Sequence, residues 1–470
     1  MKRARITMTV SFQNKLSVIM GSILGFIGIL IGTSLVVTFP TLINEFHVSL
    51  SDVQWLSSGY YLIATLVMST TAYLMKSISL KRLFQVASVI FILGSLLAAS
   101  AHSFRWLLLG CLLDALATGL ATPLMYQIVF HNIPSAQFGF YTGIVTMIKA
   151  FGPALGPTYG GVLTQLCSWR WLFIGVVPLV LIVLLVGNHV ISKNQVIPPT
   201  RSFDLIGLLI LTITLLSFDW SLNRAGKVGF THADFYIFLI IGLVLLSIFI
   251  YHVTHTKNEY LNFNILKQPI VRLRAISFFN LQFVNLSLAF LLPLFAEESL
   301  HLNAMAAGLL LLPGALIGAF TSPMAGKLYD HKGAFYTLMI ANSCLLIGVS
   351  SYYLLTTHQD ALLLGVIYLI FRIGYTFGFG NTLSDAGNYV NPQQRSDVSS
   401  LFNTLQQYAG SLGTSLMAAI IALHEAVTTN KAYAVMVGSH RSMVLLVIVI
   451  VINIILTIKA HYQALKIRKH

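Results

Sequence analysis

The chain has 470 residues, of which 56% are hydrophobic and 9% are charged. Soluble domains carry about 25% charged residues, so this composition excludes an ordinary water-soluble protein and indicates a lipid bilayer as the surrounding medium. The net charge of +14 does not indicate nucleic-acid binding, because the basic residues lie in short stretches between apolar runs and form no single patch.

Fourteen segments are long and apolar enough to be membrane helices, which need about 20 such residues. The sequence therefore predicts an all-α integral membrane protein with connections too short to hold a soluble domain. The first segment follows a basic stretch but is too long for a signal peptide, so we interpret it as a membrane helix. The predicted helices span residues 16–40, 53–74, 83–101, 106–127, 139–163, 171–191, 205–222, 234–254, 274–296, 304–325, 335–355, 361–381, 400–424 and 442–462.

The distribution of positive charge predicts the topology. Of the 28 Lys and Arg residues, twenty fall on one side of the predicted helices, six fall on the other, and Lys149 and Arg372 lie inside apolar segments. Cytoplasmic loops carry the excess of Lys and Arg, so both termini are expected in the cytoplasm.

A weak internal repeat predicts the domain organisation. The basic turn at residues 72–82 and the basic turn at residues 326–333 each follow the second helix of a six-helix unit. We expect an N-terminal bundle (1–200), two inserted helices (201–260) and a C-terminal bundle (261–470). Duplicated halves are typical of transporters that rock around a central site.

The predicted helix 139–163 carries a motif of glycines and one proline. Small residues let a neighbouring backbone approach closely, and proline frees a carbonyl and bends the helix. An ordinary packing face is the alternative, but the full spacing favours a gating contact. The motif consists of Gly143, Gly152, Gly156, Pro157, Gly160 and Gly161.

Three charged residues are expected near the bilayer midplane: Asp114, Lys149 and Arg372. A lone charge there costs about 2.5–3.5 kcal/mol on insertion scales, so each needs a function or a partner. Asp114 and Lys149 are interpreted either as a structural ion pair or as a proton-responsive pair. Five other acidic residues lie near helix ends, where a solvated position is favoured: Asp219, Glu297, Glu298, Asp385 and Glu425.

Aromatic residues and cysteines carry weaker indications. Tyr60 and Tyr61, with Trp55, either line a transport path or face lipid. The three cysteines are far apart and have no metal-ligand spacing, so no metal or cofactor is expected. The sequence lacks a phosphate-binding loop, which argues against ATP-driven transport, and no enzymatic activity is predicted.

Several motifs together resemble the major facilitator superfamily, and within it the fourteen-helix drug:proton antiporter-2 family. The resemblance implies two six-helix bundles plus two inserted helices, a monomer in a bacterial cytoplasmic membrane, and export of cationic, amphipathic or metabolite-like compounds in exchange for protons. It covers nearly the whole chain. The motifs are the glycine pattern at 143–161, Ser168–Phe173, Phe203–Gly207, Ala307–Gly314, the loop with Gly326, Asp330 and Gly333, and Ser400–Thr404 with Gly410 and Gly413.

Two acidic positions of the family pattern are altered in the N-terminal half. Ile31 stands at the usual aspartate of the first helix, and Lys76 stands at the usual aspartate of the following loop. The leading hypothesis is a proton-coupled exporter that works by alternating access, with Asp114 carrying the proton. The alternatives are a proton-independent metabolite facilitator or exchanger on the same fold, and a non-transporting receptor or accessory protein.

Overall fold

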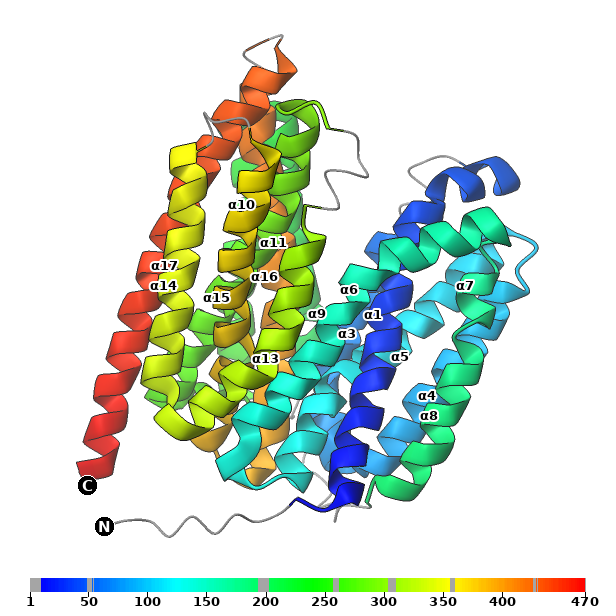
Figure 1. Ribbon diagram of the computed structural model, residues 1–470, viewed down its shortest axis with the longest axis vertical. Helices are drawn as coiled ribbons and strands as arrows, with labels where there is room; N and C mark the ends of the chain where they lie inside the picture. The colour runs from blue at the N-terminus through cyan, green and yellow to red at the C-terminus, as the bar shows by residue number, and fades with distance from the viewer. Residues whose placement is uncertain are drawn as a thin grey trace. The chain divides into compact units, whose positions relative to one another are not determined.

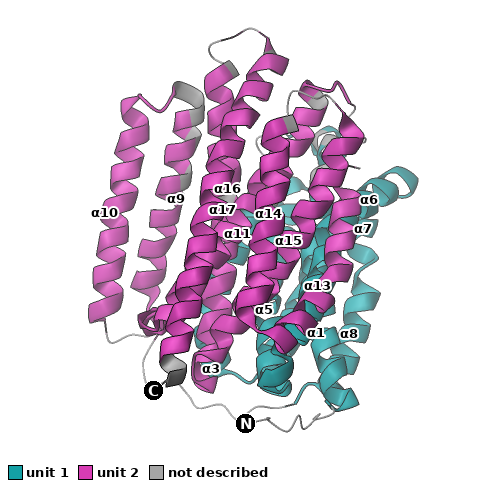
Figure 2. Cartoon of the chain, turned by 60° about the vertical axis from the view of Figure 1, so that its left-hand side comes forward, with its two compact units in different colours: residues 1–198 teal, residues 199–470 magenta. Residues whose placement is uncertain are grey.

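The chain folds into long α-helices joined by short connections (Figure 1). It forms two compact units, residues 1–198 and residues 199–470 (Figure 2). The computed structural model describes residues 10–48, 53, 55–192, 203–256, 262–302, 310–355, 360–425, 428 and 430–469.

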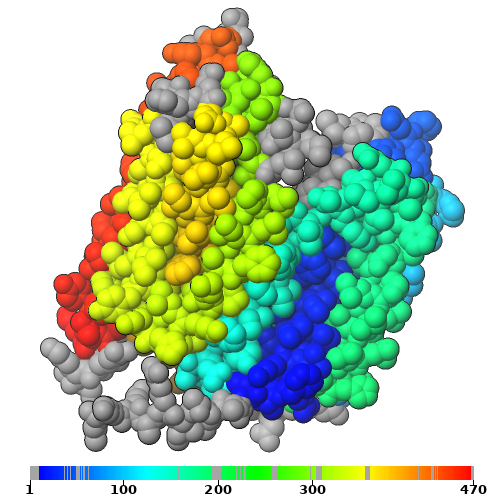
Figure 3. Space-filling model, viewed as in Figure 1, coloured from blue at the N-terminus to red at the C-terminus, as the bar shows by residue number. Residues whose placement is uncertain are grey.

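The first unit is organised around α5, which packs against α4, α3 and α1, while α6 packs along α1. Helices α1, in dark blue, and α8, in green, lie side by side on one face of this unit (Figure 3). The helices are α1 (Phe12–Phe46), α3 (Trp55–Ser77), α4 (Leu80–Ala99), α5 (Phe104–Asn132), α6 (Phe138–Leu166), α7 (Trp171–Ile174) and α8 (Val177–Val190).

The second unit contains the predicted inserted pair together with the predicted C-terminal bundle. Helix α15 packs against α14, α13 and α11, and the pair α9 and α10 joins the unit through contacts of α9 with α16. The helices are α9 (Leu205–Val228), α10 (Ala233–His255), α11 (Pro269–Glu298), α13 (Leu312–Lys332), α14 (Ala334–Leu355), α15 (Ala361–Asn388), α16 (Arg395–Glu425) and α17 (Lys431–Lys469).

Local chemistry explains where several helices begin. Side-chain oxygens of Ser11, Ser79 and Asp360 accept hydrogen bonds from backbone N–H groups of the first turns of α1, α4 and α15. These N–H groups have no partner within the helix, so such caps stabilise helix starts. Proline opens α11 at Pro269, where its missing N–H costs nothing.

All fourteen predicted segments overlap helices, although the boundaries differ. The predicted helix 171–191 is divided at Gly175 into α7 and α8, and α17 extends well beyond the predicted 442–462 at both ends. Residues 304–309 of the predicted helix 304–325 lie outside the described part. Among the described residues, ten helical spans are long and apolar enough to cross a membrane. The full count of fourteen spans and the cytoplasmic termini stay predictions.

Burial separates internal helices from peripheral ones. In α5, 72% of the most apolar stretch is buried, whereas in α10 only 11% is. The exposed residues of α10 are large and apolar, among them Ile237, Ile240 and Val244. A helix that is apolar on its exposed face is expected to meet lipid.

Candidate functional site

Asp114 lies in α5 and is fully buried against α4. The Ser95 hydroxyl of α4 donates to its carboxylate, with Oγ 3.1 Å from Oδ2 and 3.3 Å from Oδ1. A β-carbon on Gly94 would lie only 2.5 Å from Oδ1, so the missing side chain at Gly94 makes room for the carboxylate. Asp114 therefore sits inside a helix–helix interface of its own unit.

Tyr60 connects three helices next to Asp114. Its hydroxyl donates to the Gly28 carbonyl of α1 at 2.7 Å and lies 2.6 Å from Thr118 Oγ1 of α5. Thr118 Oγ1 also lies 2.8 Å from the Asp114 carbonyl oxygen. Tyr60 is thus an internal residue and does not face lipid, whereas the neighbouring Tyr61 is 44% exposed. The side chain of Trp55 lies outside the described part of the structure.

Lys149 of α6 is not brought to Asp114. Its Nζ lies 5.8 Å from the centroid of the Tyr126 ring in α5. The ion pairs among the described residues do not include one between Asp114 and Lys149. The structural ion pair considered from the sequence is therefore not formed, and Ser95 is the partner of the carboxylate instead.

The glycine motif of α6 forms a close contact with α1. Ser34 Oγ donates to the Gly156 carbonyl at 2.9 Å, and Thr33 Oγ1 lies 3.4 Å from the Gly152 carbonyl. A β-carbon on Gly160 would lie 2.6 Å from the Ser34 carbonyl oxygen. The two backbones can approach this closely only because the α6 positions lack side chains.

The other members of the motif lie in the same helix. Gly143 is buried and Gly161 is half-buried. Pro157 belongs to α6, and its side chain is outside the described part of the structure.

Arg372 of α15 is buried in the second unit, with 9% exposure. Its Nη1 donates to Asn285 Oδ1 of α11 at 2.7 Å, and its guanidinium carbon lies 5.0 Å from the centroid of the Tyr375 ring. The Tyr375 hydroxyl donates to Gln282 Oε1 of α11 at 2.6 Å. Arg372, which the sequence places near the bilayer centre, thus belongs to a polar cluster between α11 and α15.

The predicted cytoplasmic loop motif spans the end of α13. Gly326 is buried and Asp330 is half-buried in the last turns of the helix. Gly333 ends α13 with a φ of +84°, a backbone angle that residues with a side chain rarely adopt. Its N–H donates to the Tyr329 carbonyl.

A buried ion pair lies close to this motif, and the sequence interpretation missed it. Arg274 Nε of α11 lies 2.6 Å from Asp385 Oδ2 of α15, and the Tyr329 hydroxyl donates to Asp385 Oδ1 at 3.1 Å. Asn388 Nδ2 donates to the Tyr329 oxygen. The predicted solvated position of Asp385 is therefore wrong, because three helices enclose its carboxylate. Both charges lie at or near the ends of predicted apolar segments, so nothing in the sequence indicated that they pair.

The motif Ser168–Phe173 is held by Glu45, which the sequence interpretation also missed. Trp169 Nε1 donates to Glu45 Oε2 at 2.6 Å, and Arg170 Nη1 lies 2.9 Å from Glu45 Oε1. Arg170 Nη2 also donates to the Ala101 carbonyl. The motif thus ties the end of α1 to the turn between α4 and α5.

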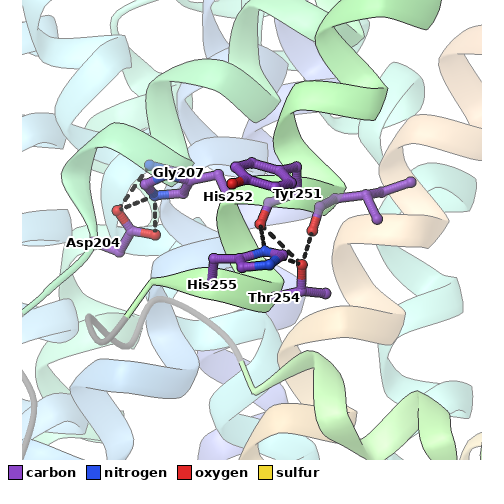
Figure 4. A network of polar contacts seen from close by, with 7 residues as sticks. Asp204, Gly207, Tyr251, His252, Thr254 and His255 are labelled. Carbon is purple, nitrogen blue, oxygen red and sulfur yellow. Dashed lines mark hydrogen bonds and ion pairs between the residues drawn. The ribbon is translucent and has the colours of Figure 1, made fainter.

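The motif Phe203–Gly207 begins α9 and joins it to α10 (Figure 4). Asp204 Oδ1 accepts a hydrogen bond from the Gly207 N–H at 2.9 Å, which caps the helix. His252 Nε2 of α10 lies 2.9 Å from both carboxylate oxygens of Asp204. This motif therefore has a structural role: it caps α9 and joins α9 to α10.

Comparison with known proteins agrees with this architecture. The sequence model of the Major Facilitator Superfamily matches residues 21–414. The uncharacterized MFS-type transporter YhcA of Bacillus subtilis is 30% identical over 395 residues, covering 84% of this chain and 74% of YhcA. The lincomycin resistance protein LmrB of Bacillus subtilis is 29% identical over 433 residues, covering 90% of each chain. The riboflavin transporter RibZ of Clostridioides difficile is 25% identical, covering 92% of this chain and 94% of RibZ.

Two solved structures share the fold at low sequence identity. The human organic anion transporter MFSD10 superposes with a TM-score of 0.66 at 14% identity, covering 93% of this chain and 99% of that one. The proton:xylose symporter XylE superposes with a TM-score of 0.63 at 12% identity, covering 93% and 94%.

Proposed function

The chain belongs to the Major Facilitator Superfamily, and from this we propose that it is a secondary active exporter that couples the efflux of small amphipathic compounds to proton entry. Members of the family are membrane transporters and not enzymes. The resemblance to lincomycin resistance proteins over most of the chain supports drug-like or other amphipathic substrates.

The close contact between α6 and α1 is the observation that carries the proposal. Three glycines on one face of α6 hold it against α1, and hydroxyl groups of Thr33 and Ser34 reach α6 carbonyls. A contact without interlocking side chains lets two helices slide or rock with little steric cost. Such a contact suits a transporter whose site opens alternately to the two sides of the membrane.

Asp114 is the group we assign to proton coupling. Its carboxylate is fully buried inside α5 of the first unit, and it accepts a hydrogen bond from the Ser95 hydroxyl. An ionised carboxylate at mid-bilayer costs about 2.5–3.5 kcal/mol, so its burial favours the protonated form and its exposure to water favours ionisation. Movement of α4 relative to α5 would then link proton uptake and release to the opening of the unit.

A proton-independent exchanger is the second candidate, and Ile31 favours it. This residue is buried in α1, and the resemblance to the drug:proton antiporter-2 family implies an aspartate at this position. An apolar side chain there cannot bind a proton, so the chain would move substrate only down its gradient or in exchange for another.

Flux in proteoliposomes separates the two candidates. The full-length protein is reconstituted, and the movement of lincomycin, riboflavin and the dye rhodamine 123 is followed with and without a pH gradient. The proposal predicts that at least one compound accumulates against its gradient only when the pH gradient is present. Equal flux in both conditions would support the exchanger and contradict proton coupling.

A further inference from the structure

Two buried side-chain hydrogen bonds join α11 and α15 in the second unit. Arg372 bonds to Asn285, and one helical turn further along α15 Tyr375 bonds to Gln282. The residues of each helix are three positions apart, so the four side chains share one helix–helix face. All four are at least nine-tenths buried. The guanidinium of Arg372 is therefore a permanent positive charge inside the unit.

No carboxylate among the described residues pairs with this charge. The acidic residues of α15 and its cap are Asp360 and Asp385, twelve and thirteen positions away from Arg372, or about 18–20 Å along the helix. On α11 the first acidic residue is Glu297, twelve positions beyond Asn285 and about as far. A guanidinium stays ionised in proteins, and a buried charge without a counter-charge is strongly destabilising. The site is thus electrostatically incomplete.

One donor of the guanidinium is left without an acceptor, although Arg372 also bonds to the Tyr368 side chain of α15. Arg372 Nε is buried and has no hydrogen-bond acceptor among the described residues. The Gln282 side-chain oxygen accepts from Tyr375, which leaves the amide nitrogen of Gln282 as a second donor. Donors without a nearby carboxylate are the arrangement that binds an oxyanion.

Two glycines of α13 pack directly against the side chain of Arg372. A β-carbon on Gly314 would lie 3.0 Å from Arg372 Cγ, and one on Gly318 would lie 3.5 Å from Nε. The glycines are one turn apart on α13, so the side chain of Arg372 packs against a face of that helix that lacks side chains. Any larger residue there would crowd the guanidinium.

We propose that Arg372, with the amide of Gln282, binds the carboxylate, sulfonate or phosphate group of an anionic amphipathic substrate. This inference rests on the proposed transport function and names the charge class of its substrate. A headgroup of a membrane lipid has the same chemistry, but Arg372 lies about 17 Å from the first residue of α15, away from the helix end where headgroups lie. The buried charge is then neutralised by the substrate when it binds.

Binding of two xanthene dyes of opposite charge tests this assignment without requiring transport. Fluorescence anisotropy is measured for fluorescein, an anion, and rhodamine 123, a cation, with the full-length protein in nanodiscs of phosphatidylcholine alone. Anionic headgroups are then absent from the experiment. The wild-type protein is expected to bind fluorescein, and Arg372→Gln should weaken this binding about tenfold or more. Rhodamine 123 binding should stay unchanged or become tighter.

Two further variants keep the test decisive if Arg372→Gln does not fold. Asn285→Asp places a carboxylate beside Nη1, so it should abolish fluorescein binding while retaining the arginine. Lys459→Gln removes one exposed positive charge of the same unit and should bind both dyes like the wild type. A matching loss in Lys459→Gln would mean that only the net charge matters, which contradicts the assignment.

Besides a matching loss in Lys459→Gln, three results overturn the inference: no binding of fluorescein by the wild type, unchanged binding in both Arg372→Gln and Asn285→Asp, or an equal loss of both dyes. Selective binding of fluorescein without any flux in proteoliposomes would instead leave the anion site standing and contradict the transport proposal. Coupled flux of rhodamine 123 without fluorescein binding would leave the transport proposal standing and contradict the anion site.

Discussion

Arg274 Nε lies 2.6 Å from Asp385 Oδ2, and the two side chains are 3% and 8% exposed. The pair joins α11 to α15 inside the second unit, and the Tyr329 hydroxyl of α13 adds a third helix. Three of the helices in this unit are therefore held together by one carboxylate.

Breaking this pair should destabilise the second unit. Asp385→Asn leaves the Arg274 charge buried without a partner, which costs about 3–5 kcal/mol. We expect a clear fall in the unfolding temperature of the purified protein in detergent. The double variant Arg274→Gln/Asp385→Asn removes both charges and should recover much of the loss. Equal stability of the single variant and the wild type would mean that the pair contributes little.

The close contact of α6 and α1 should tolerate no large side chain. Gly156→Leu is expected to abolish flux while the protein still inserts in the membrane, because the new side chain would collide with Thr33. Gly365→Leu in α15 is the matched control, since among the described residues a β-carbon there would meet only Leu310, at 3.8 Å. Normal flux in a correctly inserted Gly156→Leu protein would contradict the gating role of the motif.

The cap of α9 should depend on Asp204 more than on its histidine partner. Asp204→Ala removes the acceptor of the Gly207 N–H, at a typical cost of about 1 kcal/mol. Hydrogen exchange of the Gly207 amide should therefore become about fivefold faster. His252→Ala leaves the cap in place and should have a smaller effect at this amide. The opposite order of the two effects would show that the contact between α9 and α10, and not the cap, orders the helix start.

The predicted topology can be tested with single cysteines in a chain whose three native cysteines are replaced by serine. Asn262→Cys, before α11, should react with an impermeant thiol reagent only from the cytoplasm. Asp360→Cys, before α15, should react only from outside. Reversed labelling would mean that the number of membrane crossings before residue 262 was counted wrongly.

The helices could be predicted from the sequence because each apolar run is long and is bounded by polar or basic residues. The helix boundaries could not be predicted, since caps and prolines decide them locally. For example, Pro178 lies in the first turn of α8, directly after the break that follows α7, and hydropathy alone does not reveal this break. The family was also within reach, because its motifs have fixed spacing along nearly the whole chain.

The partners of the charged residues could not be predicted in the same way. Asp114 was expected beside Lys149, yet it bonds to Ser95, because the register between α4 and α5 is set by the fit at Gly94 and is invisible in either segment alone. Asp385 was assigned to solvent by its place near a helix end. Its burial depends on Arg274, 111 positions away in the sequence.

Proton coupling through Asp114 is the central claim of the proposed mechanism. Asp114→Asn keeps the shape of the side chain and its ability to accept the Ser95 hydrogen bond, but it cannot release a proton. Glu45→Gln is the matched change at a half-exposed carboxylate of the same unit and should leave coupling intact.

The most direct measurement compares uphill export with substrate counterflow in proteoliposomes, for the compound that the wild-type protein transports best. With Asp114→Asn at a protein level equal to the wild type, we predict that export driven by the pH gradient is lost while counterflow, which needs no net proton movement, continues. Unchanged uphill export by Asp114→Asn would contradict the account.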